Sequence, residues 1–321
     1  MRTRLLGPPR LPVSELALGT WGLTGEAYGY VEPAERDRVI DRALELGVTV
    51  FETADVYGRG EMEKCLGERL AGKDARIVTK VGTFRHDPAS GPTPGYDVYK
   101  RFDGKYLKDA VKRSCDRLKR EKIDVVLLHN PSASTMAATE AALAMNDLKQ
   151  SGVIGTWGIS AGDSYAARAA LGHGAEVIEL PYNVFFSREL HDLAGEIRAA
   201  NAGVLARSVL SYGLLAGLYI GSHSFPANDH RSNRWTRREF ESRIRQLDAV
   251  RPLVTGNVLT LRAAAVRFAL ANEMVSSVVL GPKSVSQLEE LVREAGEEPP
   301  YLTTEALTQL ATDLAHAGVM T

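Results

Sequence analysis

Four side chains that can hold or transfer protons occur at the ends of three successive apolar segments: Glu52, Tyr57, Lys80 and His129. An ammonium beside a phenol favours the phenolate and lowers a pKa that is normally about 10, so we predict that Lys80 makes Tyr57 a usable acid near neutral pH. We expect Glu52 to keep Lys80 charged and oriented, and His129 to hydrogen-bond to a substrate oxygen. Each residue alone also fits a structural role, such as packing or an ion pair. Together they favour a site that protonates a carbonyl oxygen during reduction by hydride.

Short apolar segments alternate with longer amphipathic segments along the chain, which is typical of a parallel sheet covered by helices. Strands are predicted at 15–21, 48–54, 76–82, 124–130, 156–162, 176–182, 203–210 and 276–281. Helices are predicted near 33–47, 60–72, 103–121, 135–152, 164–174, 187–201, 260–274, 284–296 and 303–318. Eight such units favour an α/β fold, a (β/α)8 TIM barrel with a short N-terminal hairpin and an extra C-terminal helix. An open doubly wound sheet is less favoured because no GxGxxG turn follows the first strand. We expect residues 1–321 to form a single domain.

Composition and charge narrow the classes of partner. The chain has 39 Lys plus Arg against 40 Asp plus Glu, a formal charge of −1, which gives no general attraction to nucleic acid or an anionic membrane. No apolar run reaches the roughly 18 residues that a membrane span needs, and prolines interrupt the N-terminal segment. The two cysteines, Cys65 and Cys115, lack the spacing of a zinc site or a disulfide framework. We therefore expect a cytoplasmic protein without a metal, acting on a small molecule.

The barrel interpretation brings the candidate residues together, because the active site of such a barrel lies at the C-terminal ends of its strands. Asn130 follows His129 at the end of the same strand, and Ser160 ends the next strand on the same face. Two long loops, 83–103 and 211–257, are expected to border the mouth. The second loop carries an arginine cluster around Trp235, made of Arg231, Arg234, Arg237 and Arg238. This cluster is open to three interpretations: a site for an anionic substrate, a clamp on a cofactor pyrophosphate, or a solvated face.

Seven motifs in order resemble the aldo-keto reductase family, from about Leu16 to Val292. They read GTW at 19–21, FETADVYGRGEMEKCLG at 51–67, TK at 79–80, LLHNP at 127–131, GIS at 158–160, PYN at 181–183 and GPKS at 281–284. The resemblance implies reduction of an aldehyde or ketone with a nicotinamide cofactor. It makes Tyr57 the general acid and assigns Lys80 and His129 to the family's catalytic tetrad. Glu52 stands at the tetrad's Asp position, with one additional methylene.

The resemblance also implies a cofactor site, with NADPH favoured over NADH. A helix N-terminus suits a phosphate, and Lys283 and Ser284 precede a predicted helix, so we expect them to contact the 2′-phosphate. The other implied cofactor residues are Gly19, Thr20, Trp21, Ser160, Glu179, Tyr182, Arg207, Ser208, Leu210, Gly213, Gly281 and Gln287. The expected substrate-binding residues are Trp21, Tyr57, Phe84, His129 and Asn130. Many family members carry Asn at the positions of Ala161 and Leu291, and Gln at the position of Glu179. The carboxylate of Glu179 can accept a hydrogen bond from the carboxamide NH2 of the cofactor, but it cannot donate one.

Two other functions remain open on the same residues. A redox-neutral isomerase or dehydratase would use Glu52, Tyr57 and His129 for proton transfer without consuming a reduced cofactor. A non-catalytic nucleotide-binding subunit would retain the cofactor site alone. The sequence does not determine the physiological substrate, the reaction direction or the oligomeric state.

Overall fold

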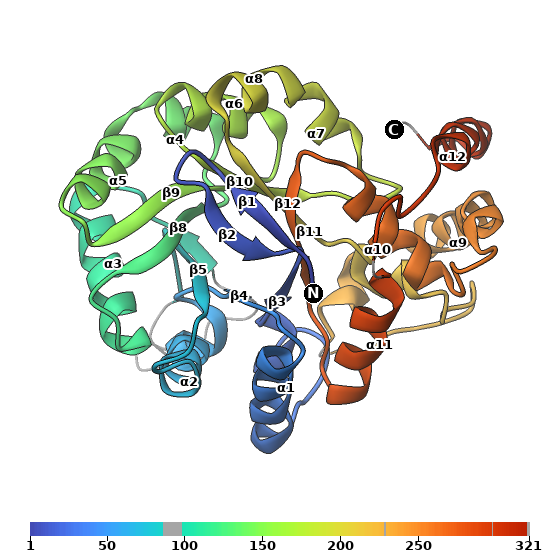
Figure 1. Cartoon of the computed structure of the whole chain (residues 1–321), viewed down its shortest axis with the longest axis horizontal. Helices are drawn as coiled ribbons and strands as arrows, with labels where there is room; N and C mark the ends of the chain where they lie inside the picture. Colours follow the sequence, from blue (N-terminus) through green and yellow to red (C-terminus); the bar gives the residue numbers. More distant parts are fainter. Residues whose placement is uncertain (86–97, 228, 297, 320–321) are drawn as a thin grey trace.

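The computed structural model describes residues 1–85, 98–227, 229–296 and 298–319. Eight parallel strands close into a barrel in the order β10-β11-β12-β3-β4-β5-β8-β9 (Figure 1). These strands are β3 (Leu16–Gly19), β4 (Val50–Glu52), β5 (Arg76–Val81), β8 (Ile123–His129), β9 (Ile154–Ser160), β10 (Val177–Pro181), β11 (Gly203–Arg207) and β12 (Val275–Leu280). Each lies within or next to a predicted strand, so the predicted barrel is confirmed.

Helices surround the barrel on its outer side (Figure 1). They are α1 (Pro33–Glu45), α2 (Glu61–Arg69), α3 (Gly104–Leu118), α4 (Ala133–Ala137), α5 (Glu140–Gln150), α6 (Ser164–Gly172), α7 (Arg188–Asp192), α8 (Ala194–Ala200), α9 (Arg237–Gln246), α10 (Leu261–Ala271), α11 (Val285–Ala295) and α12 (Thr304–His316). The helix predicted over 135–152 is two helices, because Thr139 adopts a left-handed conformation with φ 60° between them. The helix predicted over 187–201 is likewise divided into α7 and α8. Helix α9, which begins at a capping box of Thr236 and Glu239, was not predicted.

A two-stranded hairpin covers the N-terminal end of the barrel. It is formed by β1 (Thr3–Leu6) and β2 (Leu11–Ser14), and this predicted hairpin is confirmed. Leu6 and Val13 are fully buried and pack against the apolar side chains inside the barrel. A Cβ added at Gly203 would lie 2.4 Å from Leu6 Cδ1, so this close approach requires glycine.

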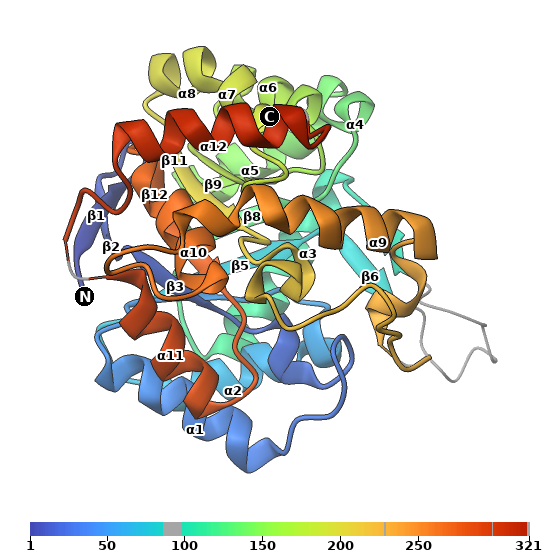
Figure 2. The same cartoon turned by 90° about the vertical axis from the view of Figure 1, so that its right-hand side faces the viewer.

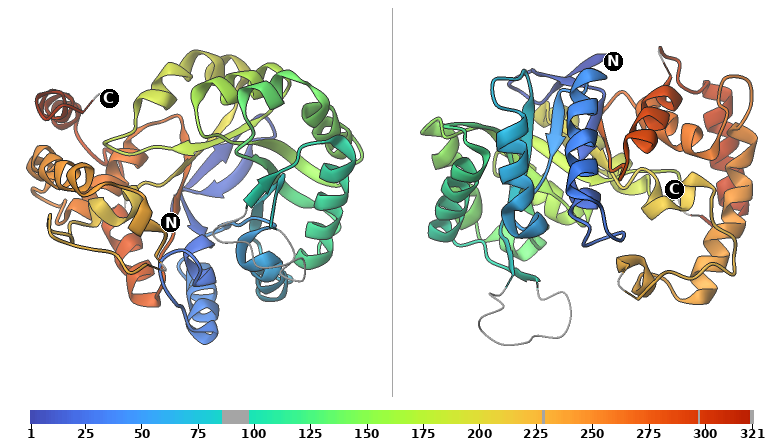
Figure 3. Two further views of the ribbon diagram at one scale, coloured as in Figure 1. Left: turned by 180° about the vertical axis from the view of Figure 1, so that it is seen from behind. Right: turned by 90° about the horizontal axis from the view of Figure 1, so that it is seen from below.

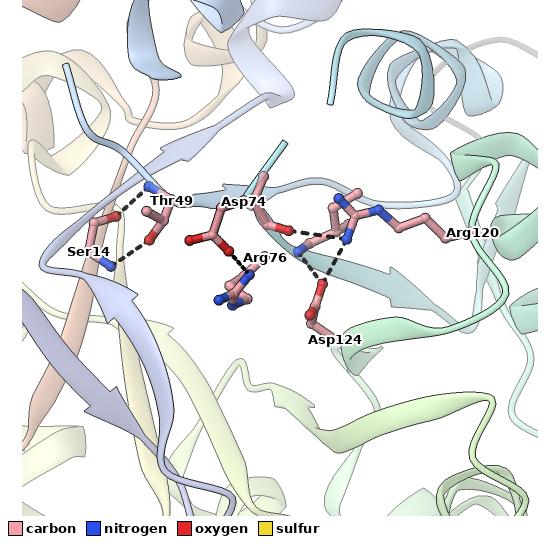
Figure 4. A network of polar contacts seen from close by, with 8 residues as sticks. Ser14, Thr49, Asp74, Arg76, Arg120 and Asp124 are labelled. Carbon is pink, nitrogen blue, oxygen red and sulfur yellow. Dashed lines mark hydrogen bonds and ion pairs between the residues drawn. The ribbon is translucent and has the colours of Figure 1, made fainter. Parts of the chain in front are cut away.

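Polar contacts tie the same end of the barrel together (Figure 4). Ser14 and Thr49 exchange two hydrogen bonds of 2.9 Å, each between a backbone N–H and a side-chain oxygen. The carboxylate of Asp124 accepts from Ile77 N at 2.9 Å and from Arg120 Nη1 at 3.2 Å. These contacts fix neighbouring strands at their N-terminal ends, and the C-terminal ends carry the polar residues described below.

The long segment between β11 and α10 reaches the end of the barrel opposite the hairpin (Figure 3). Helix α10 packs on the barrel, and α9 and α12 lie farther out, beyond α10 (Figure 1 and Figure 2). Ile244, Ala264, Leu310 and Leu314 from these three helices belong to one hydrophobic cluster that is separate from the barrel interior. Within the described residues, no helix has the length and apolar character that crossing a bilayer requires.

Candidate active site

The candidate catalytic side chains point into the barrel because they continue the two-residue period of its interior. Val78 and Lys80 share one face of β5, and Val177 and Glu179 share one face of β10. The apolar residues fill the barrel interior, and the polar residues follow them at the C-terminal ends. There they line a cavity of about 690 Å³. The polar residues from successive strands in this cavity are Glu52, Lys80, His129, Ser160, Glu179 and Arg207.

The ammonium of Lys80 lies at the centre of the polar group. It forms an ion pair with Glu52 and lies 3.6 Å from Glu179 Oε2. It also donates to Thr53 O at 3.2 Å and to the Tyr57 hydroxyl at 3.3 Å. The side chains of Lys80, Glu52 and Glu179 are each at most 5% exposed, so one buried cation is paired with two buried carboxylates. The longer Glu52 side chain therefore still reaches Lys80.

Tyr57 begins the 3-10 helix η2 (Tyr57–Gly60), five residues after Glu52, and its ring packs between aromatic neighbours. The His129 ring lies edge-on at a centroid distance of 6.0 Å, and the Trp21 ring is stacked at 6.4 Å. Tyr57, His129 and Trp21 line the cavity together with Asn130. The structure thus brings Tyr57, Lys80, His129 and Glu52 together as predicted.

The prediction that Lys80 lowers the pKa of Tyr57 is wrong in this structure. Burial raises the pKa of Tyr57, and the carboxylate of Glu179 acts in the same direction, while Arg207 opposes them. Burial lowers the pKa of Lys80 to about 8, and here Glu179 favours the ammonium. The main reason is burial of the Tyr57 hydroxyl, and the second carboxylate, Glu179, adds to it by offsetting the positive charge of Lys80. Burial and the nearby cations, first Lys80, hold the pKa of His129 well below its usual range, so its imidazole is neutral at pH 7.

Most of the predicted cofactor residues line the same cavity, and three do not. The lining includes Gly19, Trp21, Ser160, Glu179, Arg207, Ser208, Leu210, Gly213, Gly281, Lys283 and Gln287. Thr20 is fully buried outside the lining. Tyr182 follows Glu179 by three residues, so its side chain points to the outer side of the barrel, opposite to that of Glu179. Its ring stacks on Phe268 at 5.3 Å and its hydroxyl accepts from Asn272 at 3.0 Å, away from the cavity.

Ser284, the third predicted residue outside the lining, is the N-cap of α11 and accepts from Gln287 N at 3.3 Å. The next residue, Val285, donates its backbone N–H to the carboxylate of Glu35 at 2.9 Å. Lys283 donates from Nζ to Tyr28 O at 2.5 Å. The polar groups at the start of α11 therefore already have protein partners.

Phe84 is the predicted substrate-binding residue that the structure does not bring to the cavity. It lies on β6 (Thr83–Arg85), where its ring packs on Tyr99 at 5.5 Å and on Tyr106 at 6.0 Å. β6 pairs with β7 (Val98–Lys100) in an antiparallel hairpin inside the predicted 83–103 loop, of which residues 86–97 lie outside the described residues. The hairpin contributes Thr83 and Lys100 to the cavity in place of Phe84. Alternation along β6 turns Phe84 to the other face.

The predicted arginine cluster divides into two parts. Arg231 and Arg234 line the cavity, whereas Arg237 pairs with Glu241 at 3.0 Å, and Arg238 also lies outside the lining. Arg231 is engaged by Asp229 and donates to Tyr219 at 2.6 Å.

Sequence reasoning missed four aromatic residues of the cavity wall, Tyr28, Tyr212, Tyr219 and His230. The rings of Tyr28 and His230 lie 5.3 Å and 4.8 Å from that of Trp21. These aromatic residues lie in loops and short 3-10 helices, where no periodic pattern indicates the direction of a side chain.

The shape and chemistry of the cavity fit a nicotinamide dinucleotide. Glu179 Oε2 and Arg207 Nε are buried without a hydrogen-bond partner among the described residues, which leaves an acceptor and a donor for a polar amide. Gly213 has φ 90°, and a Cβ there would lie 3.1 Å from the Tyr219 hydroxyl, so glycine is needed where the segment after β11 passes the cavity. Within the described ranges, no group of three or more His, Cys, Asp or Glu side chains is placed to hold a metal ion.

Comparisons with known proteins agree with this geometry. The profile of the aldo/keto reductase family matches residues 15–307. An uncharacterised oxidoreductase of Bacillus subtilis is 28% identical over 97% of this chain and 95% of the relative. Another, from Mycobacterium bovis, is 30% identical over 93% of this chain and 90% of the relative. The solved structure of a glycerol dehydrogenase from Gluconobacter oxydans superposes with a TM-score of 0.85 at 27% identity, covering 99% of this chain and 97% of that one.

Proposed function

This chain belongs to the aldo/keto reductase family, and we propose that it is an NADPH-dependent reductase that converts an aldehyde or ketone to an alcohol. One observation supports this proposal above the others. The Tyr57 hydroxyl lies 3.3 Å from Lys80 Nζ, in a cavity that also contains the neutral imidazole of His129. The similarity to a glycerol dehydrogenase supports chemistry between alcohols and carbonyl compounds.

The residues of the barrel have separate roles in this reaction. Tyr57 donates its hydroxyl proton to the oxygen of the substrate as negative charge develops there. Lys80 orients the hydroxyl and stabilises the phenolate that remains, and Glu52 holds the ammonium in place. His129 donates a hydrogen bond to the same oxygen and polarises the carbonyl. When bound, the reduced nicotinamide supplies the hydride.

The cofactor is assigned to residues along the length of the cavity. Ser160 and Glu179 lie at the catalytic end, where Glu179 Oε2 can accept from the carboxamide NH2. Lys283 and Gln287 line the α11 end, and an ammonium there favours a phosphate on the ribose. This charge supports NADPH in preference to NADH.

Replacement of Tyr57 by Phe tests the proposal. We expect kcat to fall about 100- to 10,000-fold, because the proton donor is lost, while NADPH affinity in a fluorescence titration stays within about twofold. Tyr106→Phe removes a hydroxyl outside the cavity and serves as the matched control. Equal turnover by Tyr57→Phe and the parent protein would exclude Tyr57 as the acid.

A redox-neutral reaction remains the second candidate because two buried carboxylates, Glu52 and Glu179, accompany Tyr57 and His129. The two candidates differ in stoichiometry. A reductase consumes one reduced nicotinamide for each alcohol formed, which the loss of the cofactor's absorbance band reports. An isomerase or dehydratase forms product without that loss. Tight NADPH binding with no turnover on any carbonyl compound would instead indicate a binding subunit.

A further inference from the structure

Lys100 is a cation at the cavity that the proposed mechanism does not use. It ends β7 and lines the cavity beside Thr83, His129 and Asn130. Its ammonium donates to Thr83 Oγ1 at 2.6 Å and to the backbone oxygen of His129 at 2.7 Å. Lys100 Nζ is therefore held next to the histidine that contacts the substrate oxygen, on the side of the cavity where Tyr57 and His129 lie.

The ammonium of Lys100 is incompletely neutralised. It carries three N–H groups, of which two have the acceptors just named. No carboxylate of the described residues forms an ion pair with it, although burial of the amine lowers its pKa to about 8. The carboxylate of Asp55 forms no ion pair with Lys100, and its charge raises the pKa of the amine, against the effect of burial. Lys100 is exposed at the mouth of the cavity, and a cation without a counter-ion there attracts an anionic ligand.

Asn130 adds a second polar group at the same place. Its backbone is in the left-handed region with φ 52°, and its N–H donates to Ser160 O at 2.9 Å. Its side chain lines the cavity and makes no hydrogen bond to a described residue. An amide donor next to an ammonium is a combination that suits a carboxylate.

Arg231 and Arg234, the two cavity arginines of the predicted cluster, do not offer an equivalent site on this side. Arg231 is neutralised by Asp229 and also donates to Tyr219. Arg234 stacks over the Tyr212 ring at 3.4 Å, in the segment that follows β11. Lys100 is instead attached to the end of β8 through His129.

We propose that Lys100, assisted by Asn130, binds a carboxylate on the carbonyl substrate and thereby selects anionic aldehydes or ketones. This inference rests on the proposed reductase function and names its substrate class. Lys100 acts on binding only, since Tyr57 and His129 retain the proton chemistry. The carboxylate occupies the side of the cavity formed by β7 and the end of β8.

Two aldehydes of similar shape provide the test, p-carboxybenzaldehyde and the neutral p-tolualdehyde. We expect the parent protein to use the carboxylated aldehyde with a kcat/KM at least about tenfold higher. In Lys100→Met we expect this preference to be lost through a rise in KM for the carboxylated aldehyde, while kcat/KM for p-tolualdehyde stays within about twofold. Lys100→Arg restores part of the preference. Lys105→Met, which removes an exposed lysine paired with Asp109 outside the cavity, leaves the preference unchanged.

Two kinetic results would overturn the inference. The first is an equal preference in Lys100→Met and the parent protein, or no preference in the parent. The second is an equal loss on both aldehydes, which would show that Lys100 only holds the backbone of His129. If p-tolualdehyde is reduced with oxidation of NADPH but p-carboxybenzaldehyde is not, the proposed reductase function stands and the inference about Lys100 is rejected.

A binding measurement decides the case in which neither aldehyde is reduced. Calorimetric titration of NADPH-saturated protein with p-(hydroxymethyl)benzoate reports carboxylate binding without turnover. We expect saturable binding to the parent protein and to Lys105→Met, with affinity at least about tenfold weaker in Lys100→Met. Equal affinity in the parent protein and Lys100→Met, or no binding to the parent protein, would reject the proposed carboxylate site.

Discussion

The two ends of the cavity hold their charged groups in different ways. At the catalytic end, Lys80 is 1% exposed and is balanced by Glu52 and Glu179, all on strands of the barrel. At the α11 end, Lys283 is bound to the backbone oxygen of Tyr28, in a segment without regular structure. Strand residues are fixed by neighbouring strands on both sides, whereas the loop contact at Lys283 depends on one hydrogen bond.

This difference separates what each end contributes. The buried charges at the catalytic end depend on one another, because removal of Lys80 leaves two carboxylates without their counter-charge in a medium of low polarity. At the α11 end, Lys283 contacts the backbone oxygen of Tyr28 and Val285 contacts the half-buried carboxylate of Glu35, so a cofactor phosphate can replace these partners. We therefore expect the catalytic end to couple function to stability, and the α11 end to tune affinity for the proposed cofactor.

Replacement of the lysine at each end by Met is expected to give the largest difference in stability between the two ends. Lys80→Met removes the cation between Glu52 and Glu179, so we expect the free energy of unfolding to fall by about 3–5 kcal/mol and turnover to be lost. Lys283→Met removes no such counter-charge, and we expect a change below about 1 kcal/mol with weaker binding of NADPH. Urea unfolding and fluorescence titration of NADPH measure the two effects. Equal loss of stability in both variants would contradict the contrast between the ends.

The pH dependence of reduction provides a second test of the catalytic end. Because the pKa of Lys80 is about 8 and that of Tyr57 is raised, Lys80 loses its proton first as the pH rises. We expect kcat/KM to fall above about pH 8, approaching about tenfold per pH unit, since the ammonium that supports Tyr57 is then neutral. Glu179 favours the ammonium, so Glu179→Gln moves this fall to lower pH.

Glu68→Gln, which removes an exposed carboxylate paired with Lys119, is the control for this shift. A profile in Glu179→Gln that coincides with that of the parent protein would show that Glu179 does not influence Lys80.

The catalytic end was predictable from the sequence because strand geometry determines it. Lys80 and His129 were placed by two facts: strands end at the active-site face, and side chains alternate along each strand. The position of Glu179 inside the barrel follows from the same period. The pKa of Tyr57 was predicted in the wrong direction, because only the fold shows how deeply its hydroxyl is buried and that a second carboxylate lies near Lys80.

The rim was less predictable because irregular segments carry no period. Phe84 was expected in the cavity, but pairing of β6 with β7 turns it away and presents Lys100. Ser284 was expected to meet a phosphate, but its hydroxyl caps α11. The carboxylate of Glu35 is 250 residues away along the chain from its partner Val285, so no local pattern indicates this contact.

Glu35 is the basis of the smallest expected effect, and it tests the α11 end directly. Its carboxylate accepts from Val285 N at 2.9 Å and places a negative charge where a 2′-phosphate is expected. Glu35→Gln keeps an acceptor and removes the charge, so we expect NADPH to bind about two- to fivefold more tightly while NADH affinity stays the same. Glu45→Gln, on the same helix and paired with Arg42, is the matched control. The gain shrinks as salt is added, because it is electrostatic. Equal gains for NADPH and NADH would mean that Glu35 acts on the helix rather than on the phosphate.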